Sequence, residues 1–81
     1  MMHMNTYGLM MNGFRMVASY EAFTKGQRKL NVECYTNGTE YLVRSFFSGK
    51  TAWDDIFTDK DEANRKVKYL LNLRDWHKRI F

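Results

Sequence analysis

The chain has no proline and a single cysteine, Cys34, among its 81 residues. The absence of proline excludes Pro-rich linkers and stalks. One cysteine excludes both an internal disulfide and a four-cysteine zinc site, so the small core has to hold without cross-links. No apolar run approaches the ~18 residues that cross a bilayer, and no charged segment leads into a secretory signal. We therefore expect a cytoplasmic protein with no membrane partner.

Aromatic side chains are abundant, and basic residues exceed acidic ones. With 44% hydrophobic and 16% aromatic residues, the chain can form a packed core, which argues against intrinsic disorder. Thirteen Lys and Arg stand against nine Asp and Glu, and the resulting net charge of +4 suits an anionic partner. All five glycines lie in the first 49 residues. This asymmetry predicts a single domain, 1–81, with a turn-rich β part before a helical part.

Two Asn-Gly pairs, at 12–13 and 37–38, mark turns in the β part. An Asn-Gly pair between alternating runs favours a two-residue type I′ hairpin. Such a turn at 37–38 pairs Cys34 with Tyr41 and Val32 with Val43, which places the apolar residues on one face. The pair at 12–13 predicts a further hairpin upstream.

A loop of about three residues around Gly26 pairs Ala22 with Leu30 and Tyr20 with Val32. The predicted sheet is a four-stranded antiparallel meander within 6–47, whose strands span 6–11, 14–23, 29–36 and 39–47. The segment 14–23 also contains Met, Ala and Glu, so a helix there stays open as an alternative.

The segment from Asp59 to His77 has no Gly or Pro and begins with capping and acidic residues. Its apolar residues form two adjacent stripes at helical spacing: Ala63, Val67, Leu70 and Leu71, then Tyr69, Leu73, Trp76 and Ile80. We predict one C-terminal amphipathic helix, 59–77, packed on one face of the meander. The fold class is therefore α+β, and the sequence does not say which face is covered.

No set of side chains indicates catalysis. Residues 48–51 resemble the end of a phosphate-binding P-loop, but the position of its first glycine holds Arg44. The acids at 54, 55, 59 and 61 match no calcium loop. Cys34 falls on the apolar strand face, where a thiol is usually inert. We expect no enzyme, no cofactor and no metal site.

The basic C-terminal helix is the first candidate binding surface. Seven of the 13 cations lie within 58–81, against four acids, which gives this segment a charge of +3. Three pairs at i, i+4 favour a solvated face instead: Asp61 with Arg65, Glu62 with Lys66, and Asp75 with Arg79. The cations predicted to contact a partner are Lys66, Lys68, Arg74 and Lys78.

The second candidate is the sheet face away from the helix. Tyr35, Leu42 and Phe46 are expected to be exposed there, and Tyr35 with Arg44 completes the predicted partner-binding set. Aromatic rings beside Lys or Arg stack nucleic-acid bases or anchor a protein interface. The apolar residues of the following loop, Trp53 to Phe57, are expected to tuck under the helix. Free edge strands leave a homodimer open.

The length, the Asn-Gly hairpins, the single packed helix and the lack of a catalytic set resemble small phage-encoded inhibitor proteins, anti-CRISPR proteins among them. The resemblance covers the layout of most of the chain. It implies a non-catalytic protein that occupies a surface of a host defence or nucleic-acid-handling complex, which is a host protein or ribonucleoprotein. The alternative is a small nucleic-acid-binding domain that contacts phosphates through its basic helix.

Overall fold

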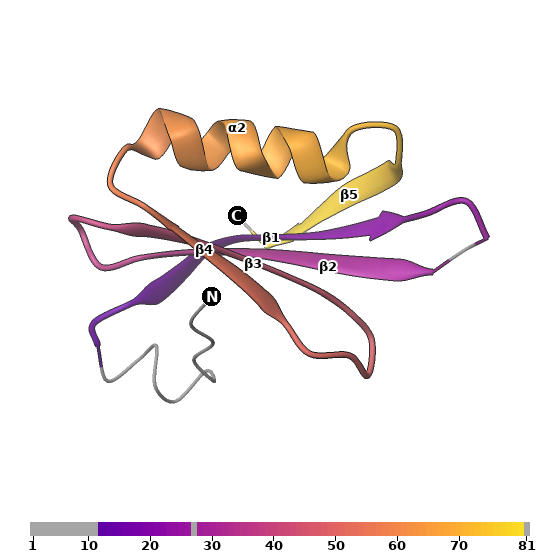
Figure 1. The fold of residues 1–81 in the computed structure, drawn as a ribbon, viewed down its shortest axis with the longest axis horizontal. Helices are drawn as coiled ribbons and strands as arrows, with labels where there is room; N and C mark the ends of the chain where they lie inside the picture. Colours follow the sequence, from indigo (N-terminus) through magenta and orange to yellow (C-terminus); the bar gives the residue numbers. More distant parts are fainter. Residues whose placement is uncertain (1–11, 27, 81) are drawn as a thin grey trace.

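Five strands and one helix make up the part of the chain that the computed structural model describes, residues 12–26 and 28–80. The elements follow in the order β1 (Arg15–Phe23), β2 (Lys29–Thr36), β3 (Tyr41–Phe47), β4 (Trp53–Phe57), α2 (Lys60–Leu71) and β5 (Asp75–Ile80). The strands form one antiparallel sheet in the order β4-β3-β2-β1-β5, and α2 lies across one of its faces (Figure 1).

The α+β class and the single C-terminal helix are confirmed, and the count of four strands is wrong. The predicted strand 29–36 is β2, and the predicted strands 14–23 and 39–47 contain β1 and β3, the latter starting two residues later than expected. The predicted strand 6–11 lies outside the described residues. The expected helix 59–77 ends at Leu71, and 75–80 forms β5. The loop expected to tuck under the helix contains β4, in which Trp53 and Ile56 are exposed.

The first predicted register is confirmed, and the second is displaced by two residues. Ala22 faces Leu30 and Tyr20 faces Val32, as expected. Cys34, however, faces Val43 rather than Tyr41.

The reason lies in the side chain of Asn37, whose Oδ1 accepts the N–H groups of Thr39 at 3.0 Å and Glu40 at 2.7 Å. These bonds close a longer loop over 37–40 in place of the two-residue turn. A displacement of two residues keeps every side chain on its predicted face.

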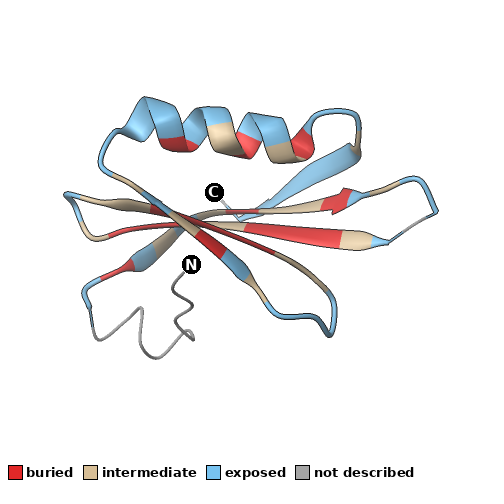
Figure 2. Ribbon diagram, viewed as in Figure 1, coloured by how far each residue is buried: buried red, intermediate tan, exposed pale blue. Residues whose placement is uncertain are grey.

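The main core lies between α2 and the sheet, where Figure 2 shows buried segments of both layers facing each other. Helix residues at i, i+4 spacing contribute Ala63, Val67 and Leu71. The sheet contributes Ala22, Leu30, Val32 and Val43. Asp59 caps the helix, because its Oδ1 accepts the N–H of Asp61 at 3.0 Å.

The opposite sheet face carries a second, smaller cluster, and this corrects an expectation. Tyr35 and Leu42 are 5% and 0% exposed and pack with Phe14, so they are not surface residues. Arg44 is buried too, because Asp54 lies directly across from it on β4. Its Nε and Nη2 donate to the two Asp54 oxygens at 2.8 and 3.0 Å. Such a two-point ion pair allows both charges to be buried.

Candidate binding groove between the helix and the last strand

The helix sits off the centre of the sheet and leaves a groove beside it. α2 packs mainly against β3 and β4, whereas β1 and the edge strand β5 lie at the other side of the sheet. All six residues of β5 are exposed. A groove of about 380 Å³ lies between the C-terminal half of α2 and these strands. We call it the α2–β5 groove, and its main lining residues are Tyr20, Val67, Lys68, Leu73, Arg74 and Trp76.

The strand wall of the groove is aromatic. The rings of Tyr20 and Trp76 meet edge to face, with centroids 5.6 Å apart. Trp76 is 51% exposed, which is unusual for so large an apolar side chain. Lys78 Nζ lies 5.9 Å from the centroid of the Tyr20 ring, within the range of a cation–π contact. This wall therefore presents apolar area beside positive charge.

The turn that joins α2 to β5 holds an exposed leucine in a backbone conformation that leucine rarely adopts. Leu73 follows the C-cap residue Asn72 and has φ of +63°. Glycine or asparagine usually holds this left-handed position, and another L-residue costs about 1–2 kcal/mol there. The Leu73 side chain is also 96% exposed. Neither backbone geometry nor packing within the described chain explains leucine here.

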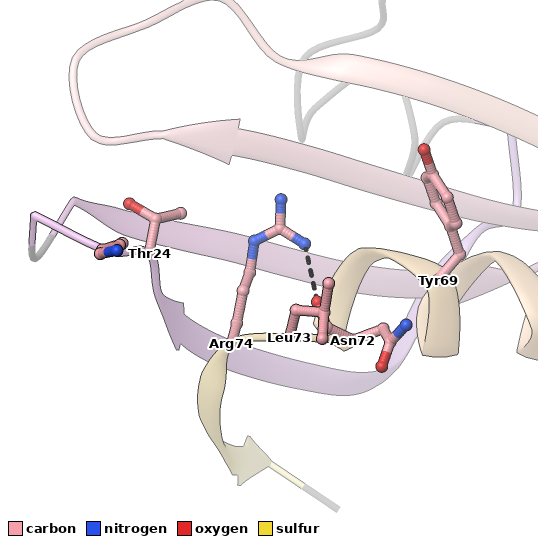
Figure 3. Close-up of a pocket in the computed structure, with 6 residues that line it drawn as sticks. Thr24, Tyr69, Asn72, Leu73 and Arg74 are labelled. Atoms are coloured by element: carbon pink, nitrogen blue, oxygen red, sulfur yellow. Dashed lines mark hydrogen bonds between the residues drawn. The ribbon is translucent and has the colours of Figure 1, made fainter.

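The rim of the groove is basic. Lys68 and Arg74 line it, and none of the described residues that line it is acidic. Over residues 12–26 and 28–80, no ion pair involves Lys68, Arg74 or Lys78. Arg74 Nη1 donates instead to the carbonyl oxygen of Leu70. It also donates to the carbonyl oxygen of Asn72 at 3.4 Å, the bond drawn as a dashed line in Figure 3. Unpaired carbonyl oxygens at the C-terminal end of a helix favour a nearby cation. Because they are neutral, the charge of the Arg74 guanidinium still has no acidic partner there.

Of the six residues predicted from the sequence, Lys68 and Arg74 line this groove, and Lys78 lies beside it against Tyr20. Lys66 points to the other side of α2, where its Nζ lies 3.4 Å from Asp55 Oδ2 on β4. Tyr35 and Arg44 belong to the buried cluster on the far sheet face and are not accessible to a partner. The groove residues that the sequence interpretation missed are Tyr20, Leu73 and Trp76. Asn72, a common helix terminator, is the signal that could have separated the last two from the helix.

A charged cluster on the far sheet face fixes the edge strand. The Glu21 carboxylate on β1 lies 3.3 Å from Lys29 Nζ, 3.2 Å from His77 Nε2 and 3.3 Å from Arg79 Nε. Burial opposes ionisation of Glu21, but the hydrogen bond from Lys29 and the surrounding positive charges outweigh it and lower the pKa. The expected pair of Asp75 with Arg79 is wrong, because these residues lie on a strand and Arg79 faces Glu21.

Among the described residues, no three His, Cys, Asp or Glu side chains gather in a way that could hold a metal ion. Burial raises the pKa of the Cys34 thiol to about 11, although the charge of Lys78 acts in the other direction. The thiol therefore stays protonated near neutral pH, where the thiolate would be the nucleophile. Within the described ranges, no helix is long and apolar enough to span a membrane.

Comparisons with protein-family models, with curated proteins and with solved structures find no match to this chain.

Proposed function

We propose that the chain is a non-catalytic binding protein whose α2–β5 groove docks an acidic, amphipathic segment of a partner protein. The observation that carries this proposal is the exposed Trp76 and Leu73 beside a rim of cations that have no acidic neighbour in the groove. Apolar side chains of the partner would cover Trp76 and Leu73. Its Asp and Glu residues would pair with Lys68, Arg74 and Lys78.

The distribution of side chains resembles that of known interface hot spots. Trp, Tyr and Arg dominate such hot spots, and an aromatic anchor surrounded by polar residues is their usual arrangement. The cations add specificity and a faster association rate more than they add affinity. Binding should therefore weaken with salt but persist at physiological ionic strength, because the apolar contact is not screened.

The role predicted from the sequence, a phage or mobile-element inhibitor, indicates which class of protein would bind in the groove. A binder without catalytic groups acts by occupying a surface. The partner would then be a protein of a host defence or nucleic-acid-handling complex that presents an acidic segment. That identity stays a prediction, and the groove supports only the acidic and apolar character of what binds.

A display selection of random peptides against the folded protein tests the proposal. We expect enriched peptides to interleave Asp or Glu with Leu, Phe or Trp. The best peptide should bind Lys68→Glu at least tenfold more weakly than wild type, because the substitution places a negative charge at the rim, and this charge repels the acidic side chains of the peptide. Arg65→Glu is the matched control, since Arg65 is an exposed helix cation that does not line the groove. Enriched peptides without acids, or equal losses for both variants, would refute the proposal.

Nucleic-acid binding through the basic helix is the alternative, and a gel-shift series at low salt separates the two. Phosphate contacts release counterions, so such binding would fall steeply as salt rises. The pairing of Lys66 with Asp55 withdraws one helix cation from this role. The alternative would be favoured if wild type retards DNA or RNA, Lys68→Glu does not, and Trp76→Ala still does.

A further inference from the structure

A second cavity, of about 350 Å³, lies at the other end of α2, between its first half and strands β1, β2 and β3. We call it the Cys34 cavity. The lining residues that matter here are Arg15, Val17, Cys34, Val43, Lys60 and Val67. Neither Leu73 nor Trp76, which line the α2–β5 groove, lines this cavity.

Small side chains and a strand irregularity create this cavity. On the sheet face under the helix, Ala18 pairs with Cys34, so two small residues lie opposite each other there. The β1–β2 register shifts between Met16 and Ala18, which makes Val17 an extra residue in β1. A bulge of this kind bends the strand and changes the direction of its side chains. Together these features leave open space against the helix.

The lining is apolar at its base and positively charged at its rim. Val43 and Val67 are buried, whereas Arg15 and Lys60 are exposed. None of the described residues around the cavity is acidic, and in the described part of the chain neither Arg15 nor Lys60 forms an ion pair. Ligand pockets in proteins typically measure about 300–1,000 Å³ and combine an apolar lining with a few polar groups.

We propose that the Cys34 cavity binds a small amphipathic carboxylate, with its alkyl chain against Cys34, Val43 and Val67 and its carboxylate at Arg15 and Lys60. The chain length is limited by the cavity, so a medium-length fatty acid fits better than a membrane lipid. Binding is non-covalent, because no group in the lining is activated as a nucleophile. This site goes beyond the proposed function, since it takes a different class of ligand and shares only the buried Val67 with the α2–β5 groove.

An NMR titration of the labelled protein with octanoate tests the proposal, with octanol as the uncharged probe. We expect octanoate to cause saturable chemical-shift changes at Val17 and Cys34. Octanol should bind roughly tenfold more weakly, because it has no carboxylate to form a charge-assisted hydrogen bond with Arg15 or Lys60. Arg15→Glu should weaken octanoate binding by at least tenfold. Arg65→Glu, outside the cavity, should leave it unchanged. Octanol bound as tightly as octanoate, equal effects of the two substitutions, or no saturable shifts would overturn the proposal.

Filling the cavity gives an independent test. Cys34→Leu should abolish the octanoate shifts while the fold is retained. If this variant does not fold, because extra volume in a packed core is destabilising, the octanol and Arg15→Glu comparisons still decide. Trp76→Ala separates this site from the groove: octanoate binding should be unchanged in it, so failure of one proposal is distinguishable from failure of the other.

Discussion

Leu73→Gly should make the free protein more stable while it weakens partner binding. Leucine at φ of +63° costs about 1–2 kcal/mol relative to a conformation it prefers. Glycine removes this strain, but its greater freedom in the unfolded chain offsets about 0.5–1 kcal/mol. The side chain is 96% exposed, so removing it sacrifices little packing. We expect a net gain of roughly 0.5–1 kcal/mol, which for a domain of this size raises Tm by about 2–8 °C.

Leu73→Ala is the control that separates backbone from side chain. It removes the exposed side chain but keeps a Cβ in the left-handed region, so thermal and urea unfolding should show no gain in stability. Both variants should weaken binding of a groove-directed acidic peptide to a similar extent, since both lack the apolar anchor. If Leu73→Gly is less stable than wild type, or if Leu73→Ala is equally stabilised, the argument from backbone strain is refuted.

Three further outcomes follow from the charged and ionisable groups. Asp54→Asn should cost about 3–5 kcal/mol in urea unfolding, because it leaves the buried Arg44 unpaired; a loss below 1 kcal/mol would contradict the structure. Since the pKa of Glu21 is lower in the folded chain than in the unfolded one, Glu21 stabilises the fold above the ordinary Glu pKa of about 4.3. That stability is lost as the pH falls through the lower, folded-state pKa. The free energy of unfolding of Glu21→Gln should therefore depend less on pH than that of wild type over this acidic range. Parallel curves of unfolding free energy against pH for the two proteins would refute the role of the cluster. Cys34, whose pKa is raised to about 11, should react with iodoacetamide at pH 8 about a hundredfold more slowly than a free cysteine, following its thiolate fraction; a rate near that of a free thiol would show that the site opens.

The central strands could be predicted because two independent signals agree there. The alternation of apolar residues in β1 and β2 and the loop around Gly26 both require Ala22 to face Leu30, and it does. In the hairpin between β2 and β3, the same kind of signal predicts the faces of the strands but not the length of the loop. Its alternation gave the correct faces, but the hydrogen bonds of the Asn37 side chain set the loop length. A turn dipeptide alone does not specify those bonds.

The end of the helix could not be predicted, because the apolar residues there fit two periods. Tyr69, Leu73, Trp76 and Ile80 are spaced as on a helix, while Trp76 and Ile80 are also an even number of residues apart and so share one face of a strand. Pairing of 75–80 with β1 decides between them, and that contact is distant in sequence. The sequence therefore predicts only part of the groove. The count of charges in the last segment predicts its cations, but no pattern in the sequence predicts its aromatic wall.

The expected exposure of Tyr35 and Arg44 failed for a related reason. The sequence pattern places Asp54 in a loop, because it contains no signal for the short strand β4. Once β4 pairs with β3, Asp54 faces Arg44 and neutralises it. A buried arginine can be anticipated only when its partner is known, and here the partner depends on the register of an edge strand.

The affinity of an acidic, apolar-containing peptide for Trp76→Ala and Trp53→Ala tests the proposed groove most directly. The two tryptophans are 51% and 59% exposed and lie on opposite edge strands, β5 and β4, so they are closely matched. We expect a loss of at least tenfold, about 1.4 kcal/mol, for Trp76→Ala and no change for Trp53→Ala. Equal losses, or a loss confined to Trp53→Ala, would contradict it.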